Sequence, residues 1–116
     1  MNDFEIKQFK NENVELSVNV SPSLDTVWLT KEQMSILFNR DRSVISRHIN
    51  NIYNEGELDK ESTCAKNEHM VLNRERLYET ELYNSYVIIT VGYRVKSKNG
   101  ILFRKWANSI LKEYIL

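Results

Sequence analysis

The sequence predicts an α+β fold in which two short helices lie between two β-hairpins and two further helices follow. Three observations support this prediction. Residues 14–20 alternate between apolar and polar side chains, as expected of a strand with one buried face. Residues 30–53 contain two helical apolar patterns separated by a short polar connection. Residues 102–115 form a wide apolar stripe at helical spacing.

The first hairpin is predicted over residues 14–29. Its first strand has four alternating apolar residues, and residues 21–25, Ser-Pro-Ser-Leu-Asp, have the composition of a turn. Residues 26–29, Thr-Val-Trp-Leu, are β-branched, aromatic and aliphatic, which favours a second strand. The apolar residues of the first strand are Val14, Leu16, Val18 and Val20.

A first helix is predicted to begin after Thr30. Thr30 and Gln33 have the spacing of a capping box, in which each side chain bonds to the backbone amide of the other residue. Asn39 tolerates the left-handed conformation that ends many helices. The buried face of this helix is predicted to consist of Met34, Leu37 and Phe38.

A second helix is predicted from Arg42 to Tyr53. Asp41 is a suitable N-cap, and Gly56 follows as a residue that ends helices. The helix has one apolar stripe, made of Ile45, Ile49, Ile52 and Tyr53.

A second hairpin and two more helices are predicted in the C-terminal half. Residues 64–71 and 77–83 flank a polar tip at residues 73–76, Asn-Arg-Glu-Arg. Asn84 can cap an apolar segment at residues 86–91, whose β-branched composition by itself favours a strand. The last helix is predicted to follow residues 97–100, with a stripe made of Leu102, Phe103, Trp106, Ala107, Ile110, Leu111, Tyr114 and Ile115.

Length and composition predict one domain over residues 1–116 and narrow the function classes. The 116 residues carry sixteen basic and sixteen acidic side chains, so the net charge is zero, but no acid occurs in residues 94–105, which hold five basic residues. The single cysteine, Cys64, fits a reducing cytoplasm, and the sequence has neither an export signal nor a membrane span. We expect no metal, no cofactor and no small-molecule substrate, because no ligand cluster or phosphate loop is recognisable.

The order helix, turn, helix and hairpin predicts a winged helix-turn-helix that binds double-stranded DNA. At 100° per residue, one polar face of the second helix lies roughly 140° from the isoleucine stripe. Arginine can contact guanine, asparagine can contact adenine, and serines allow close approach to the bases. The spacing alone is also compatible with a solvated polar face that has no role in DNA binding. The face consists of Ser43, Ser46, Arg47 and Asn50.

Several basic residues are candidates for contacts with DNA phosphates. Arg40 and Arg42 flank the start of the second helix, where free amides favour an anion. Lys66 and Arg74 belong to the second hairpin, which would act as the wing, or else as a plain solvent-exposed hairpin. Residues 94, 96 and 98 are also basic, and contact with phosphate or simple solvation of a loop are equally compatible with them.

The sequence does not predict an enzyme. Cys64 could in principle pair as a nucleophile with His69 or His48, but no orienting group or oxyanion motif accompanies them. We therefore expect no catalytic residue.

Five segments between residues 27 and 114 form a distinctive set. They are Val27-Trp28-Leu29-Thr30, Asp41 to Ile49, Glu55-Gly56-Glu57-Leu58, Val91-Gly92-Tyr93-Arg94-Val95 and Phe103-Arg104-Lys105-Trp106-Ala107. Together they resemble the RhuM family of bacterial virulence proteins, and the last is similar also to phage antirepressor DNA-binding domains. The resemblance implies a DNA-binding domain and a helix over residues 84–95, in spite of their composition. It also implies the N-terminal part of a longer protein, or a truncated gene, with a regulatory role tied to mobile elements or phages.

A different class of function remains open at this point. The same fold can serve as a protein-interaction or dimerisation module that delivers a fused effector. The neutral net charge and the apolar stripe of the last helix, which could support a homodimer, favour this alternative.

Overall fold

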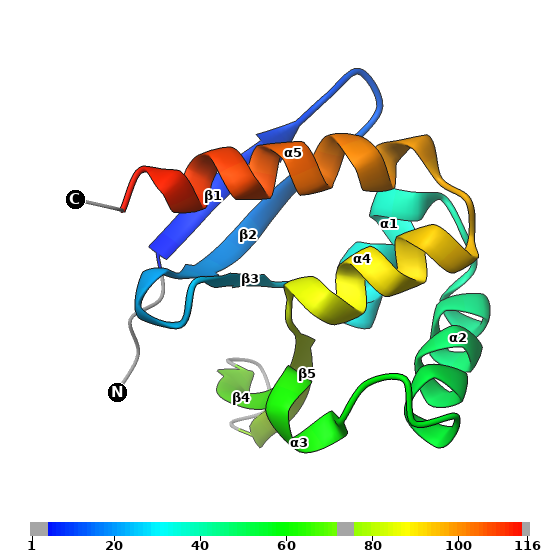
Figure 1. The fold of residues 1–116 in the computed structure, drawn as a ribbon. Coiled ribbons are helices and arrows are strands. Elements are labelled where there is room, and N and C mark those ends of the chain that lie inside the picture. Colours follow the sequence, from blue (N-terminus) through cyan, green and yellow to red (C-terminus); the bar gives the residue numbers. More distant parts are fainter. Residues whose placement is uncertain (1–4, 72–75, 115–116) are drawn as a thin grey trace.

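The computed structural model describes the backbone of residues 5–71 and 76–114, and their side chains except those of residues 67–79. The chain forms an α+β structure with one three-stranded antiparallel sheet, one two-stranded antiparallel sheet and helices packed around them (Figure 1). The elements in order are β1 (Glu5–Lys10), β2 (Glu15–Ser21), η1 (Pro22–Leu24), β3 (Thr26–Trp28), α1 (Lys31–Phe38), α2 (Arg42–Asn54), α3 (Lys60–Thr63), β4 (Cys64–Val71), β5 (Arg76–Tyr83), α4 (Ser85–Arg94) and α5 (Lys98–Lys112).

The three-stranded sheet contains the predicted first hairpin and one strand that was not predicted. β2 pairs with β3 as expected, with Val20 opposite Val27. β1 pairs with the other edge of β2, with Phe9 opposite Leu16. β1 was missed because Phe9 is its only buried residue, so the strand has no alternating apolar pattern.

The capping box at the start of α1 is confirmed. The Thr30 hydroxyl accepts a hydrogen bond from the Gln33 amide, and the Gln33 side-chain oxygen accepts one from the Thr30 amide, both at 3.0 Å. The Gln33 side-chain nitrogen also donates to the Ser17 carbonyl on β2 at 2.7 Å. The capping box therefore joins α1 to the three-stranded sheet.

Replacing Thr30 by alanine should destabilise the protein by about 1 kcal/mol, because it removes the acceptor for a free helix amide. The measurement is urea unfolding followed by circular dichroism. Thr30→Ser keeps the hydroxyl and should keep most of the stability. Equal losses for the serine and alanine variants would contradict the capping role.

The two C-terminal helices are confirmed, with two corrections for α5. α4 begins after Asn84, whose side chain accepts from the Tyr86 and Val87 amides, so capping and burial outweigh the β-branched composition of this segment. α5 begins at Lys98, earlier than predicted, because Ser97 caps it. Leu102, a member of the predicted apolar stripe, is 47% exposed and does not join the core, and Ile115 lies outside the described residues.

The core lies between the three-stranded sheet and the helices. α5 crosses one face of this sheet, where Phe9 packs edge-on against Phe103 and Trp106. The second hairpin is confirmed as β4 and β5, and its base is joined to the chain before α1 by two backbone hydrogen bonds between Leu29 and Tyr83, at 3.0 and 2.8 Å. α2 lies at one side of this assembly (Figure 1).

Candidate nucleic-acid interface

A three-residue connection sets the position of α2 relative to α1. Asn39 adopts a left-handed conformation, with φ of 54°, as its residue type predicted. The Ser35 hydroxyl donates to the Arg40 carbonyl at 2.6 Å, which holds the chain as it leaves α1. Asp41 then caps α2 by accepting from the Ser43 amide at 3.0 Å and from the Ser43 hydroxyl at 2.5 Å. These two bonds lower the pKa of Asp41.

α2 packs against the core through the predicted isoleucine stripe. Ile45, Ile49 and Ile52 are fully buried. Tyr53 is half-buried, and its hydroxyl lies 2.9 Å from the Thr63 hydroxyl. Gly56, with φ of 78°, follows the end of the helix as expected. The inner face of α2 is therefore fixed to the rest of the protein.

The opposite face of α2 is polar and open. Ser43, Arg47 and Asn50 are exposed, and Ser46 is half-buried. The Arg47 side chain makes no hydrogen bond or ion pair with any residue that the structure describes. The helix contains two arginines and a histidine but no acidic residue. The four predicted residues thus share one side of one rigid helix.

The two arginines before this face have partners within the protein. Arg42 lies 3.3 Å from the Glu32 carboxylate in an exposed ion pair. Arg40 donates to the carbonyls of Phe38, Asn39 and Val95, at 3.1, 3.2 and 2.8 Å. Arg40 therefore connects the α1–α2 turn to the end of α4, a structural role that sequence reasoning missed. Carbonyl partners of this kind carry no signal in the sequence.

The second hairpin brings one predicted residue beside the start of α2. Lys66 on β4 and Arg42 line the same depression, of about 650 Å³, together with Lys31. Glu32 and Glu81 also line it, so its charge is mixed. Arg74, predicted at the tip of the hairpin, lies outside the described residues.

The basic residues around the α4–α5 turn differ in their contacts. Arg94 donates to Glu55 at 2.8 Å and to Glu57 at 2.7 Å, and these bonds raise its pKa. Its charge is therefore offset within the protein. Lys96 and Lys98 are exposed on the turn itself.

His48 is a feature of α2 that the polar-face pattern did not identify. Its Nδ1 atom is buried, with no hydrogen-bond partner among the described residues. Burial lowers the pKa of His48, and the neighbouring charges of Arg47 and Arg94 lower it further. Because an ordinary histidine already titrates below neutral pH, the neutral form of His48 predominates at pH 7.

The structure offers little to a nucleophile at Cys64. Partial burial raises the pKa of the thiol, which reduces its thiolate fraction at neutral pH. The side chain of His69 lies outside the described residues. Within the described part of the chain, no three histidine, cysteine or acidic side chains gather as a metal site would require. The expectation that the chain is not an enzyme stays a prediction.

Comparison with known proteins identifies the family. The described helices include none with the length and apolarity to cross a membrane. The chain is an α+β protein in which one helix, α2, has an exposed polar face next to a hairpin. It belongs to the Virulence protein RhuM family, whose model matches residues 59–116. No curated protein and no solved structure matches the chain.

The family match confirms the resemblance found in the sequence and covers two of its five segments. Residues 91–95 and 103–107 lie inside the matched region. The segments before residue 59, including residues 41–49 of α2, lie outside it. The polar face of α2 is therefore argued from its own geometry.

Proposed function

We propose that this chain is a winged-helix domain, spanning residues 1–116, that binds double-stranded DNA by placing α2 in the major groove. The observation that carries this proposal is the outer face of α2, which has open hydrogen-bonding side chains and no acid, on a helix whose inner face is buried. The major groove admits an α-helix, and arginine and asparagine pair with the edges of guanine and adenine.

The arrangement of the second hairpin supports the winged-helix part of the proposal. In this type of fold a strand before the helix pair joins the base of the hairpin that follows it. Here Leu29, directly before α1, bonds to Tyr83 at the end of β5. Lys66 on the hairpin and Arg42 on α2 line one depression. These two observations support the proposal that the hairpin acts as a wing beside α2.

Each predicted residue has a role in this proposal. Arg47 and Asn50 would contact bases, and Ser43 and Ser46 would allow close approach. The residues that would hold the phosphate backbone are Arg42, Lys66, Arg74 and, with donors left over from its carbonyl contacts, Arg40.

The proposal includes a regulatory role on bacterial DNA. The net charge of zero implies few nonspecific phosphate contacts, so affinity would depend more on base contacts than it does in a strongly basic protein. The second candidate function, a protein-interaction module, is favoured by the groove between α4 and α5 described below.

Titration of duplex DNA at several salt concentrations tests the proposal. We expect binding that weakens with salt, with a log–log slope of about −0.9 for each phosphate contact. Arg42→Ala and Lys66→Ala should each reduce that slope by about one. Lys10→Ala, on β1, removes an equal charge away from α2 and should leave the slope unchanged. Absence of binding at roughly 100 μM protein and low salt would contradict the proposal, because nonspecific binders reach about 10⁻⁴ to 10⁻⁶ M even at physiological salt.

A further inference from the structure

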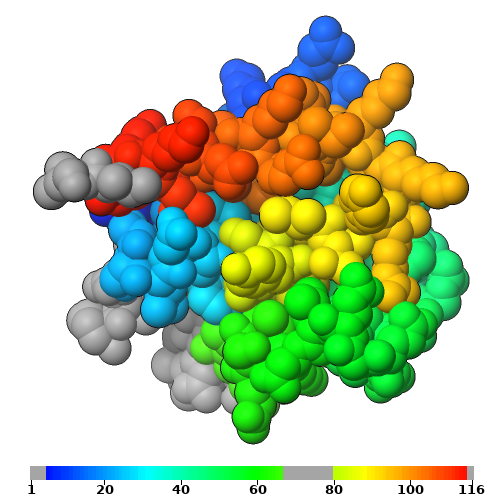
Figure 2. Space-filling view, in the orientation of Figure 1, coloured from blue at the N-terminus to red at the C-terminus, as the bar shows by residue number. Residues whose placement is uncertain are grey.

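A groove follows the seam between α4 and α5. It consists of two depressions, of about 580 and 640 Å³, that share Ile89. The first lies at the α4–α5 turn, and the second continues past α4 to Leu24 before β3 and Leu111 near the end of α5. Figure 2 shows both helices on one face, with α5 above α4 and the segment around residue 24 at one end.

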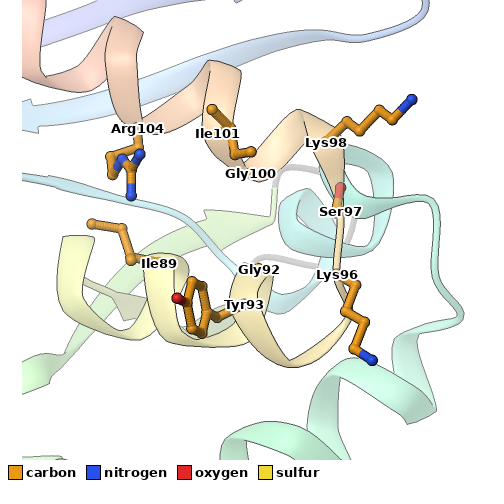
Figure 3. Close-up of a pocket in the computed structure, with 9 residues that line it drawn as sticks. All are labelled: Ile89, Gly92, Tyr93, Lys96, Ser97, Lys98, Gly100, Ile101 and Arg104. Atoms are coloured by element: carbon orange, nitrogen blue, oxygen red, sulfur yellow. The ribbon is translucent and has the colours of Figure 1, made fainter.

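The shape of the groove follows from a close helix crossing. A Cβ atom on Gly100 would lie only 3.4 Å from the Gly92 Cα, so the two helices approach closely at this pair. In Figure 3, Ile89 from α4 and Arg104 from α5 extend toward each other across the space between the helices, and Tyr93 lies on α4 beside Gly92. The glycines therefore close one end of a groove that opens along both helices.

Exposed apolar side chains are concentrated in this groove. Seven large apolar residues in the described part of the chain are exposed, and four of them line it. Tyr93 has 83% of its surface exposed, and Ile101 has 50%. Contiguous apolar surface of this kind marks interaction sites, whereas single exposed residues do not. The four residues are Leu24, Tyr86, Tyr93 and Ile101.

The charges around the groove are nearly all positive. Lys96, Lys98 and Arg104 line the first depression, and no described acidic residue does so. Lys112 and Asp25 line the second. An occupant with an apolar face and acidic flanks would match this pattern.

The length of the groove fits a helix. Lys98 and Lys112, near its two ends, are fourteen residues apart on α5, which corresponds to about 21 Å. A helix of about four turns spans that distance and presents apolar residues at i, i+3, i+4 and i+7.

Two other occupants fit less well. If two copies of this chain packed groove to groove, the same basic residues would face each other across a two-fold axis. Single-stranded nucleic acid stacks its bases on aromatic platforms, whereas Ile89, Ile101 and Leu111 make much of this lining aliphatic.

We infer that the α4–α5 groove binds an acidic amphipathic α-helix of a partner protein. The apolar face of the partner helix contacts Tyr93, Ile89 and Ile101. The carboxylates of the partner helix face Lys96, Lys98 and Arg104. This surface is separate from the outer face of α2, so the inference does not depend on DNA binding.

The test uses the whole chain and three labelled peptides of about fourteen residues. One is helical, with leucines at i, i+3, i+4 and i+7 and glutamates elsewhere. The second replaces the glutamates by lysines, and the third scrambles the acidic peptide so that the stripe is lost. Fluorescence anisotropy should give a Kd of about 100 μM or tighter for the acidic helix, and binding about 10-fold weaker for each of the others.

Variants locate the site. Tyr93→Ser with Ile101→Ser should weaken binding of the acidic helix about 10-fold, because both side chains are exposed and contribute to the interface. Ile36→Ser, at a residue 54% exposed on α1, is the matched control and should leave it unchanged. The double variant should bind DNA like the unaltered chain, so failure of this inference and failure of DNA binding can be told apart.

Four outcomes would overturn the inference. These are absence of binding by the acidic helix at about 1 mM, equal binding by the lysine peptide, displacement of the acidic helix by a short oligothymidine, and a dimer in sedimentation that the double variant abolishes.

Discussion

Arg47→Ala is expected to abolish sequence discrimination at one base pair of the target site, at a cost of about 1–3 kcal/mol. The Arg47 side chain is exposed on α2 and makes no hydrogen bond or ion pair with the described residues, so its guanidinium is available to a guanine. Affinity for a selected site and for its single-base variants, measured at one salt concentration, gives the change. The site itself comes from selection on random duplexes.

The control for Arg47→Ala is Arg104→Ala, which removes the same charge from α5. This variant should retain the full discrimination, because Arg104 lines the α4–α5 groove. Both variants should unfold at the same urea concentration as the unaltered chain, since both side chains are exposed. An unchanged base preference after Arg47→Ala would show that this arginine does not read a base.

Phe38→Ala should destabilise the protein by about 3–5 kcal/mol. Phe38 is 1% exposed at the end of α1, and its ring lies beneath the crossing of α4 and α5. A Cβ atom on Gly92 would come within 3.2 Å of this ring, which shows how tightly the crossing is packed. Truncation would leave a cavity that the two helices cannot close without moving the turn between them.

Urea unfolding with an unchanged m value measures this loss. Because small domains are stable by about 5–15 kcal/mol, the variant should lie close to its unfolding threshold at 37 °C. Ile36→Ala, on the exposed side of the same helix, should cost less than about 1 kcal/mol. A loss below about 1 kcal/mol for Phe38→Ala would contradict the packing described.

The elements that could be predicted from the sequence are those with strong local signals. The Thr30 capping box, the Asp41 cap and the isoleucine stripe of α2 depend on residues within one helix, and all three are present. β1 and the single turn of helix α3 were not predicted, because neither has a strong local signal in the sequence. β1 has one buried residue and is a strand only because β2 is beside it.

Residues 84–95 show where local composition misleads. Their β-branched side chains favour a strand, and only the resemblance to relatives predicted a helix. The helix forms because Asn84 caps it, and because Val87, Ile88 and Val91 bury one face against the core. Tertiary packing decided the conformation.

The candidate DNA-binding face was predicted as a set because its members share one helix. Contacts between distant segments had no such signal. The bond from Arg40 to the Val95 carbonyl joins residues 55 positions apart, and the pairing of Arg94 with Glu55 and Glu57 is similarly remote. Neither pairing leaves a periodic pattern in the chain. The groove between α4 and α5 also depends on how two helices cross, which periodicity alone does not determine.

The bridge between Leu29 and Tyr83 affects how this protein can be divided and exchanged. It joins the chain before α1 to the region covered by the family match, and Thr26 and Ser85 bond beside it at 2.9 Å. The hydrophobic core takes residues from both sides of position 59. A break in the chain at that position would therefore divide the core, and the hydrogen-bonding groups of Leu29, Tyr83, Thr26 and Ser85 would lose their partners. A fragment that keeps this core intact must include β2 and β3 along with residues 59–116.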